Sequence, residues 1–562
     1  MQTCLICCPL HVDAPDQVTD ALDRARRATA AGARLIEWRV DLLAEEDHDV
    51  ALRCIRALVA DSPAPCIVTI RPSWEGGLYG GSETDRVSLL EAIGAGDVAP
   101  RYIDVELDAY RTSRNRRQKF NLAVDHDAQP RDVTPRLILS THDFTKRPDD
   151  LLQRGAAMAS EPACAVMKFA WHARSLRDNL EAFDLLAERV KPTVALCMGE
   201  FGLLSRVLAP KFGGLFTFAA LERGAESAPG QPTIDDLRTR YRFDAIGRAT
   251  KVYGVIGWPV GHSKSPVVHN AGFAALDVDG VYLPLPVPAE WEHFKATVGA
   301  LVDHGRLDFR GASVTVPHKE HLVRFVRERG GAVSGLADAL GAANTLIVAE
   351  DRSLRCANTD AAAAAQALAS ARGGTLVGAR VAILGAGGVA RAVAGAVALA
   401  GGHATLVARD HAKALRVAGE IAERASRVDV ASLDACERPA TPATFGSIDA
   451  VRADTLGCGC FDAFVNATPV GMVGGPEPDG DPVASVALGA DVEPNYDGVV
   501  VFDTVYAPQW TPWLRVARDR GATCLTGVDM FLAQAERQFE AWTGVAPPVG
   551  LFAAELQRST RS

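Results

Sequence analysis

The first candidate for chemistry is a lysine inside an apolar stretch. Lys168 stands within Cys-Ala-Val-Met-Lys-Phe-Ala-Trp, residues 164–171, a run with the length and composition of a strand. An ammonium group is rarely buried without a partner, and burial favours the neutral amine, which is a nucleophile. The alternative is a side chain that extends from a strand end into water. The stretch taken alone favours this alternative, and residues elsewhere must decide between the two.

A histidine and three arginines extend this chemistry. His142 carries a side chain that exchanges protons near neutral pH, and Arg39, Arg71 and Arg206 suit an anionic carbonyl substrate. A lysine Schiff base makes the adjacent carbon acidic, and a histidine can remove its proton. Simpler explanations exist for each residue. His142 could be a core histidine and Arg71 a surface residue, and Arg39 could form an ordinary ion pair with Glu37.

A second lysine stands where a cation is unfavourable. Lys319 ends the stretch 311–319, a strand followed by Pro-His-Lys at the expected start of a helix. A helix N-terminus disfavours a cation by up to about 1 kcal/mol, so Lys319 is either exposed or placed for chemistry. Asp360 is a possible partner that would keep the ammonium oriented toward a developing alkoxide. Ser263 and Ser265 could bind a carboxylate, although helix capping is the simpler explanation.

A glycine-rich turn indicates a nucleotide. Residues 385–390, Gly-Ala-Gly-Gly-Val-Ala, match G-x-G-x-x-A between a strand at 380–384 and a helix at 391–400. Glycines let the backbone approach a pyrophosphate at the helix N-terminus. Arg409 follows the next strand and fits the 2′-phosphate of NADP. Asp410 beside it could instead bind the ribose of NAD, but we favour NADP.

The elements that must position these residues begin with a barrel. We expect strands at 3–9, 34–40, 65–70, 102–107, 136–141, 163–169, 193–198 and 214–218, alternating with helix-like segments. Eight strands in this length are typical of a (β/α)8 barrel, whose active site gathers at the carboxyl ends of the strands. Six of these strand ends carry polar groups, and burying them unpaired would cost several kcal/mol each.

Composition bounds the function. The chain has 562 residues, enough for several domains, with a formal net charge of −10 that argues against nucleic-acid or anionic-membrane partners. No apolar stretch reaches transmembrane length, and the 12 scattered cysteines suggest reduced thiols, so we expect a cytoplasmic protein. Neither Cys4 with Cys7 nor Cys458 with Cys460 forms a credible zinc site, and we expect no metal.

Residues 1–240 resemble the type I 3-dehydroquinate dehydratases. The matching motifs are Glu-Trp-Arg-Val-Asp at 37–41, Arg-x-x-x-Glu-Gly-Gly at 71–77, Thr-His-Asp-Phe at 141–144, the strand lysine, Ser-Arg at 205–206 and Ser-Ala-Pro-Gly-Gln at 227–231. The resemblance implies that Lys168 forms a Schiff base, that His142 is the general acid and base, and that Glu75 orients it. It implies that the substrate is held by Glu37, Arg39, Arg71, Arg206, Ser227 and Gln231.

Residues 250–560 resemble shikimate dehydrogenases. The matching motifs include Ser-Lys-Ser-Pro at 263–266, Val-Thr-Val-Pro-His-Lys at 314–319, Asn-Thr-Asp at 358–360 and Asn-Ala-Thr-Pro-Val-Gly-Met at 466–472. The resemblance implies that Lys319 and Asp360 form the catalytic pair. It assigns shikimate binding to Ser263, Ser265, Thr315, Asn344, Tyr506 and Gln534. It assigns NADP(H) binding to Gly385, Ala386, Gly387, Gly388, Val389, Ala390, Arg409, Asn466, Thr468, Gly527 and Met530.

Some residues depart from the dehydrogenase pattern. Ser313 stands where Asn is common in single-function members, and Ala361 follows Asp360 where Gly is usual. Ala-Arg-Asp at 408–410 replaces the usual Asn-Arg-Thr, which leaves NAD open. Residues 425–460 match no motif and are expected to belong to the nucleotide domain.

The expected protein is thus α/β throughout, with a TIM barrel followed by a two-domain dehydrogenase of Rossmann type. The expected boundaries are 1–243 for the barrel, 244–251 for a linker, 252–357 with 524–560 for the substrate-binding domain, and 358–523 for the NADP-binding domain. The resemblance implies dehydration of 3-dehydroquinate and reduction of 3-dehydroshikimate to shikimate, with small molecules as partners. The alternatives are another Schiff-base lyase or aldolase, a quinate dehydrogenase, or a non-catalytic regulator.

Overall fold

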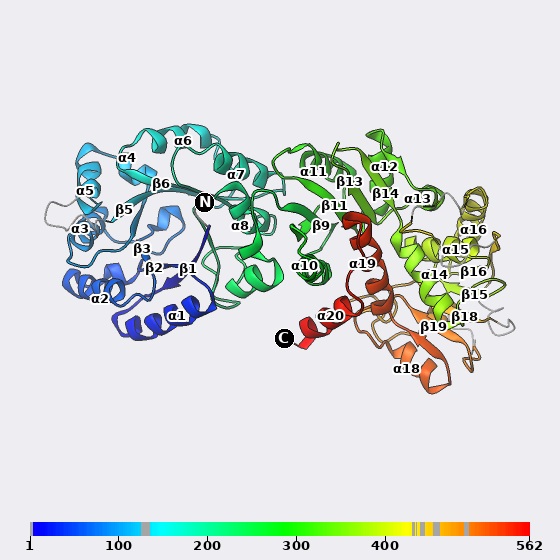
Figure 1. The fold of residues 1–562 in the computed structure, drawn as a ribbon. Helices are drawn as coiled ribbons and strands as arrows, with labels where there is room; N and C mark the ends of the chain where they lie inside the picture. The colour runs from blue at the N-terminus through cyan, green and yellow to red at the C-terminus, as the bar shows by residue number, and fades with distance from the viewer. Residues whose placement is uncertain are drawn as a thin grey trace. The chain divides into compact units, whose positions relative to one another are not determined.

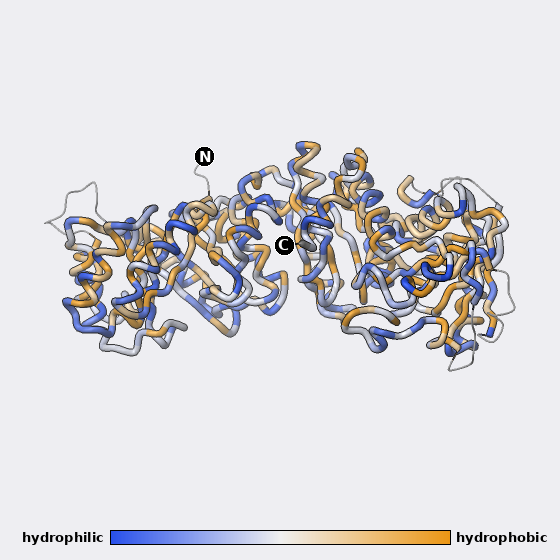
Figure 2. Tube along the Cα trace, turned by 90° about the horizontal axis from the view of Figure 1, so that it is seen from below, coloured by the Kyte–Doolittle hydropathy of each residue, from blue (hydrophilic) through white to orange (hydrophobic). Residues whose placement is uncertain are grey.

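A computed structural model of the chain describes residues 4–124, 135–429, 433, 435–438, 444–452, 461–487 and 494–561. Cys458 and Cys460 lie outside these ranges. The chain divides into two compact units, Met1–Lys251 with Asp279–Pro286, and Val252–Val278 with Val287–Ser562. None of the described helices is long and apolar enough to cross a membrane. In Figure 2 hydrophobic and hydrophilic stretches alternate along most of the chain, as expected for elements with one buried face.

The first unit contains an eight-stranded parallel sheet in the order β7-β6-β5-β4-β3-β2-β1-β8. Its strands are β1 (Leu5–His11), β2 (Leu35–Arg39), β3 (Cys66–Thr69), β4 (Tyr102–Glu106), β5 (Arg136–Asp143), β6 (Cys164–His172), β7 (Thr193–Met198) and β8 (Phe216–Phe218). The amide of Leu215, just before β8, donates to the carbonyl of Thr193 in β7 at 2.9 Å, which links the two ends of the sheet. The eight predicted strands and the barrel are confirmed.

Helices surround these strands (Figure 1). They are α1 (Val18–Ala31), α2 (His48–Ala60), α3 (Glu83–Gly94), α4 (Leu107–Arg111), α5 (Arg114–Val124), α6 (Leu151–Ser160), α7 (Asp178–Ala187), α8 (Leu203–Val207) and α9 (Ala209–Phe212). A π-helical turn at Asp236–Arg240 follows the last strand.

The barrel interior changes character along its strands. Apolar side chains such as Leu35, Ile67 and Ile138 form a core cluster toward the amino ends. Two residues further along the same strands stand Glu37, Thr69 and Ser140, and these polar side chains are also buried. Because alternate residues of a strand share one face, the pattern places polar groups inside the barrel at the carboxyl half.

A mixed six-stranded sheet follows, in the order β10-β9-β11-β13-β14-β12. Its strands are β9 (Lys251–Gly257), β10 (Gly280–Pro286), β11 (Phe309–Val314), β12 (Ala332–Val333), β13 (Thr345–Val348) and β14 (Leu354–Ala357). Its neighbouring helices are α10 (Ser265–Ala275), α11 (Trp291–Asp303), α12 (Lys319–Glu328) and α13 (Gly335–Leu340).

A parallel six-stranded sheet completes the fold, in the order β17-β16-β15-β18-β19-β20. Its strands are β15 (Arg380–Leu384), β16 (His403–Val407), β17 (Ser447–Ala450), β18 (Ala463–Asn466), β19 (Val500–Asp503) and β20 (Thr523–Leu525). Numbered along the chain, this order is 3-2-1-4-5-6, the doubly wound arrangement of dinucleotide-binding domains. The predicted Rossmann-type sheet is confirmed, and β17 lies in the stretch that matched no motif.

The helices of this part are α14 (Thr359–Ala371), α15 (Gly388–Leu399), α16 (His411–Ala425), α17 (Pro482–Ala487), α18 (Pro512–Asp519), α19 (Gly527–Thr543) and α20 (Leu551–Arg561). Alanines dominate the faces of α14 and α15 that pack into the core. Helix α19 returns to the mixed sheet, where Ser313 of β11 donates to the Gln538 Oε1 at 2.6 Å. Ser313, which departs from the common Asn, therefore attaches the returning helix to a strand.

Candidate active sites

Lys168 lies inside the barrel. Its side chain projects from β6, and the residue is only 4% exposed. Nζ lies 2.7 Å from the Asp104 Oδ2 and 3.5 Å from the Glu37 Oε1, and 4.7 Å from the centre of the Phe218 ring. The alternative of a side chain that extends into water is wrong, because β6 directs this position inward, where carboxylates compensate its charge.

Asp104, the partner of Lys168, belongs to a network of buried ion pairs. Arg71 donates to Asp104 at 2.8 Å and to Glu106 at 2.5 Å, and Arg86 pairs with the other oxygen of Glu106 at 2.8 Å. Burial alone would raise the pKa of Asp104, but the positive charges of Arg71 and Lys168 outweigh burial and lower it. Asp104 therefore stays ionised. Arg71 is buried, so its interpretation as a surface residue is wrong.

Sequence reasoning missed Asp104, Glu106 and Arg86. The signal for the first two was present in β4, Tyr-Ile-Asp-Val-Glu, where acidic residues occupy alternate positions of an otherwise apolar strand. Alternate positions face the same side, so both carboxylates enter the barrel. Arg86 gave no comparable signal, because its place on α3 resembles that of any helical arginine.

His142 and Glu75 form a hydrogen-bonded pair. The His142 Nδ1 lies 2.9 Å from the Glu75 Oε1, and the backbone amide of His142 donates to the same oxygen at 2.6 Å. Burial, together with the cations of Arg71 and Lys168, lowers the pKa of His142 well below its usual value. Burial also raises the pKa of Glu75 to about 8. The imidazole is thus neutral near pH 7, and its Nε2 is left to act as a base.

Glu37 and Arg39 each have a partner of their own. Glu37 accepts a hydrogen bond from the Thr69 hydroxyl at 2.9 Å, and Arg39 donates to Asp41 at 2.8 Å. Asp41 also accepts from the backbone amide of Arg71 at 2.8 Å. The ion pair between Glu37 and Arg39 that the sequence allowed is not formed, since both side chains lie in different networks.

Arg206 and Gln231 present donors without acceptors. Arg206 is 1% exposed, and its Nε and Nη2 have no hydrogen-bond partner among the described residues. Burial lowers its pKa to about 10. The Gln231 Oε1 accepts from the amide and hydroxyl of Ser227, whereas its buried Nε2 has no partner there. A buried cation without an anion is costly, so Arg206 is placed for a negatively charged ligand.

These side chains come together at the carboxyl ends of the barrel strands. One cavity is lined by Glu37, Arg39, Arg71, Glu75, Gly76, His142, Phe144, Lys168, Ala170, Leu196, Met198, Arg206, Phe218, Ser227 and Ala228. It joins a buried amine, a neutral imidazole and a guanidinium without an acceptor. This set can form a Schiff base, move a proton and bind an anion.

Lys319 and Asp360 form an ion pair in the second half. Lys319 is the first residue of α12, and its Nζ lies 2.6 Å from the Asp360 Oδ2 on the first turn of α14. Their side chains are 23% and 15% exposed, so the pair is accessible but partly desolvated. The unfavourable position of a cation at a helix N-terminus is thus offset by a carboxylate.

Two amides predicted to bind substrate lie near each other. The Asn344 Nδ2 is 3.5 Å from the Gln534 Oε1, and the Asn344 Oδ1 accepts from the amide and hydroxyl of Thr359. Tyr506 stacks on Phe531, one helical turn before Gln534.

The serines and Thr315 have simpler surroundings. The Ser263 hydroxyl accepts from the amide of Ser265, the first residue of α10, at 3.2 Å, and the N-cap of the helix is Lys264, without a side-chain cap. Thr315 follows β11, and its amide donates to Ile256 at 2.9 Å.

The glycine-rich turn is open where a pyrophosphate would approach. Gly385 has a positive φ of 119°, and Gly387 is the N-cap of α15 without a side-chain cap. A Cβ at Gly387 or Gly388 would meet no atom within 4 Å. Free amides of a helix N-terminus beside open space fit a phosphate group. Ala386 and Ala390 pack into the core instead, with Val389 against them.

Arg409 and Asp410 differ in how they are used. Asp410 is the N-cap of α16, where its Oδ1 accepts from the Lys413 amide at 2.9 Å. The Arg409 side chain is 62% exposed, with Glu477 at 3.9 Å. Asp410 is thus engaged by its own helix, whereas Arg409 is available to a ligand.

Four residues predicted to bind the cofactor have internal contacts. Asn466 donates to Val470 and to Asp503, and it accepts from the amide and hydroxyl of Thr468. Gly527 begins α19, where a Cβ would lie 2.4 Å from the carbonyl oxygen of Val505. Met530 belongs to the core cluster. These residues therefore shape the turns beside the sheet.

Two lysine-centred sites, one in a barrel and one beside a dinucleotide-binding sheet, define a two-site α/β enzyme. Family models match as follows: Type I 3-dehydroquinase at residues 6–248, the shikimate dehydrogenase substrate binding domain at 255–346, and the shikimate 5′-dehydrogenase C-terminal domain at 527–557.

Curated relatives cover both halves. A protein of Arabidopsis thaliana described as bifunctional 3-dehydroquinate dehydratase/shikimate dehydrogenase, chloroplastic, is 32% identical over 98% of this chain and 83% of its own length. A shikimate dehydrogenase (NADP(+)) of Methanocella arvoryzae is 36% identical over 55% of this chain and 98% of its own. A 3-dehydroquinate dehydratase of Methanococcus maripaludis is 32% identical over 42% and 97%. This chain belongs to the family of bifunctional 3-dehydroquinate dehydratase/shikimate dehydrogenases.

Proposed function

We propose that the barrel removes water from 3-dehydroquinate through a Schiff base on Lys168, and that the second half reduces the product, 3-dehydroshikimate, to shikimate with NADPH. The observation that carries the proposal is the buried Lys168 amine, which shares one cavity with the His142–Glu75 pair and with Arg206. Family membership over the whole chain supports the coupling of the two reactions.

In the barrel, the proposed role of each residue follows from its contacts. Asp104, 2.7 Å from Nζ, stabilises the cationic iminium that forms when Lys168 attacks the ketone and water leaves. The neutral His142 removes the proton from the adjacent carbon, while Glu75 fixes its Nδ1. The imidazolium then protonates the departing hydroxyl, and water hydrolyses the Schiff base to release product and amine. Arg206 binds the substrate carboxylate.

In the second half, Lys319 is proposed as the proton donor. Asp360 holds its ammonium at 2.6 Å, oriented toward the substrate carbonyl, so that Lys319 protonates the oxygen as reduction proceeds. NADPH, when bound, supplies the hydride. Gly387 and Gly388 would hold its pyrophosphate, and the exposed Arg409 would bind its 2′-phosphate.

The remaining assignments are proposals of the same kind. We keep 1–243 for the barrel, 244–251 for the linker, 252–357 with 524–560 for the substrate-binding domain and 358–523 for the NADP-binding domain. The contacts of α19 with β11 and β13 support the inclusion of the returning helix. The described cysteines are all free, which supports a reducing, cytoplasmic setting.

Borohydride trapping tests the proposal. The enzyme is incubated with 3-dehydroquinate, reduced with borohydride and mapped by mass spectrometry. We expect one substrate-derived mass increment, on Lys168. Label on another lysine, or no label under conditions of turnover, contradicts the Schiff-base assignment. Reduction of 3-dehydroshikimate is measured with NADPH and NADH in parallel, and a preference for NADH contradicts the role of Arg409.

A further inference from the structure

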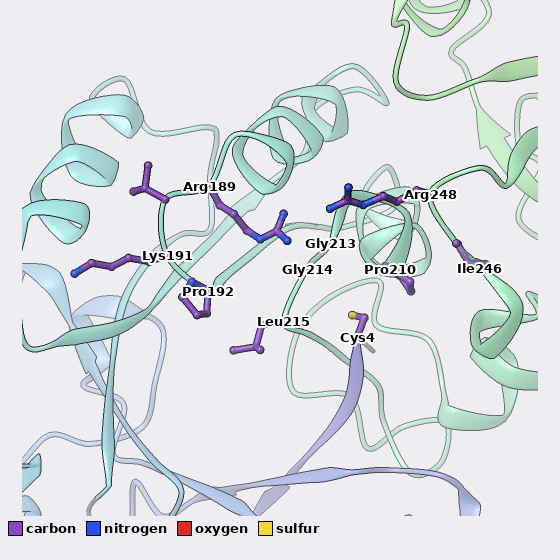
Figure 3. A pocket seen from close by; sticks show the side chains of 12 residues that line it. Cys4, Arg189, Lys191, Pro192, Pro210, Gly213, Gly214, Leu215, Ile246 and Arg248 are labelled. Carbon is purple, nitrogen blue, oxygen red and sulfur yellow. The ribbon is translucent and has the colours of Figure 1, made fainter. Parts of the chain in front are cut away.

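A second cavity lies at the amino ends of the barrel strands, opposite the lysine site (Figure 3). Its lining begins with Cys4, just before β1, Pro192, just before β7, and Leu215, just before β8. The segment Ile246-Gly-Arg248 closes one side. The cavity holds about 680 Å³, against about 60 Å³ for the cavity around Lys168, and it lies in the range of small-molecule sites.

Two guanidinium groups face each other across this cavity. Figure 3 shows Arg189 and Arg248 extending toward one another from opposite walls, while Lys191 points away. No carboxylate is found among the residues that line the cavity in the part of the chain that the structure describes. Like charges that converge without a counter-charge create a local positive potential that favours an anion.

Arg189 is held in this position by the barrel. Its Nη1 donates to the carbonyl oxygens of Leu186 at 2.6 Å and Phe212 at 3.2 Å. Gly213 makes room for it: φ is +78°, and a Cβ there would lie 2.6 Å from Nη2. The guanidinium is therefore fixed before any ligand arrives, which lowers the entropic cost of binding.

Arg248 is held through its backbone. The buried Lys211 donates to the carbonyl oxygen of Arg248 at 2.9 Å and to that of Thr250 at 2.7 Å. The Gly247 amide donates to the Thr250 hydroxyl at 2.8 Å. The turn is thus attached to the barrel, while the exposed Arg248 side chain has no hydrogen-bond acceptor among the described residues.

We propose that this cavity binds a phosphate monoester of a small, largely apolar organic molecule, with the phosphate between Arg189 and Arg248. A phosphate dianion matches two guanidinium charges, and each guanidinium can donate two parallel hydrogen bonds. The remaining wall is apolar and suits a hydrocarbon or ring; its residues are Val190, Pro192, Pro210, Leu215 and Ile246. The site is separate from the proposed reactions, because it lies at the other end of the barrel.

Occupancy of the site has a structural consequence. The Ile246–Arg248 segment lies within the expected linker. A phosphate that contacts both arginines would connect this segment to the loop after α7. We expect the amides of Gly247 and Thr250 to exchange more slowly with solvent when the ligand is bound, because opening of this turn would then break ligand contacts.

Calorimetric titration of the full-length enzyme with phenyl phosphate tests the proposal. We expect saturable binding that weakens at least about tenfold in R248Q, because a charge-assisted pair is lost. R53Q removes the same charge from an exposed position on α2 and should change binding less than twofold. Both reaction rates without ligand should match wild type in R248Q, which shows that the variant is folded.

Three results would overturn the proposal. The first is that phenyl phosphate does not bind at millimolar concentration, and the second is that it binds R248Q as tightly as wild type. The third is that inorganic phosphate binds as tightly as phenyl phosphate, which would show that the apolar wall does not contribute to binding. R189Q provides an independent check, with weakened binding expected and unchanged binding counting against the site. Hydrogen exchange of residues 246–250 with phenyl phosphate separates binding here from binding at the Lys168 cavity.

Discussion

The two proposed catalytic lysines lie in opposite environments. Lys168 is buried among carboxylates inside a closed barrel, and Asp104 beside it is also paired with Arg71. Lys319 stands at a helix N-terminus with one carboxylate, and both partners are partly exposed. A lysine that must become an iminium is surrounded by fixed negative charge, whereas a lysine that donates a proton stays in contact with solvent. The difference teaches that the task of a lysine is set by what surrounds its amine.

Removal of the first amine should have the largest effect. In K168A, formation of 3-dehydroshikimate from 3-dehydroquinate should fall at least about 10⁴-fold, because no Schiff base can form. Reduction of supplied 3-dehydroshikimate by NADPH should stay within twofold of wild type. Both rates follow from absorbance changes in one preparation. A loss of both activities would break the separation of the two sites.

Removal of the second amine is the reverse experiment. In K319A, reduction of 3-dehydroshikimate should fall about 10²- to 10⁴-fold, the usual contribution of a general acid. The dehydratase rate should be unchanged. The smaller loss reflects that hydride transfer does not require a covalent bond to the lysine. A variant that keeps its reductase rate would remove Lys319 from the proposed chemistry.

The carboxylates should differ in their effect on stability. D104N leaves Arg71 and Lys168 buried with less compensation and should lower the free energy of unfolding by about 3–5 kcal/mol. D360N affects a partly exposed pair and should cost about 1 kcal/mol or less. Urea titrations with probes in each half measure both. Equal losses would show that burial does not distinguish the two pairs.

Acid should silence the dehydratase before the reductase. In its proposed role His142 is a neutral base, and burial with nearby cations lowers its pKa below 6.5, so activity should be lost as pH falls through that lowered value. The proposed role of Lys319 is to donate a proton, and a fall in pH does not oppose that role. We expect the acid limb of the dehydratase kcat/KM below pH 6.5. An acid limb above 6.5, or earlier loss of reduction, contradicts these roles.

The cofactor prediction carries the smallest effect. R409A should raise the KM for NADPH about tenfold, the value of one charge-assisted hydrogen bond, and leave the KM for NADH unchanged. R416A, at an exposed position on α16, is the matched control. Equal effects on both cofactors would show that Arg409 does not distinguish them.

The strands and the main motifs could be predicted from the sequence because apolar runs and turn residues are local signals. Lys168 and Lys319 stood out as cations in unusual positions, and the family motifs assigned proposed roles to both and to His142. The charge network was not, because Asp104, Glu106 and Arg86 interact over long separations that appear only when the barrel closes. The capping role of Asp410 was also hidden, since a carboxylate beside Arg409 looks the same in either use.

Helix α19 has a consequence for synthesis. The barrel strands are complete at Phe218, so the barrel can close while the rest of the chain is still being translated. The mixed sheet is completed later, because Ser313 of its strand β11 donates a hydrogen bond to Gln538, and the helix that carries Gln538 is synthesised more than two hundred residues later. A ribosome-bound chain that ends before α19 would therefore carry a closed barrel and a mixed sheet whose inner strands β11 and β13 lack the helix that contacts them.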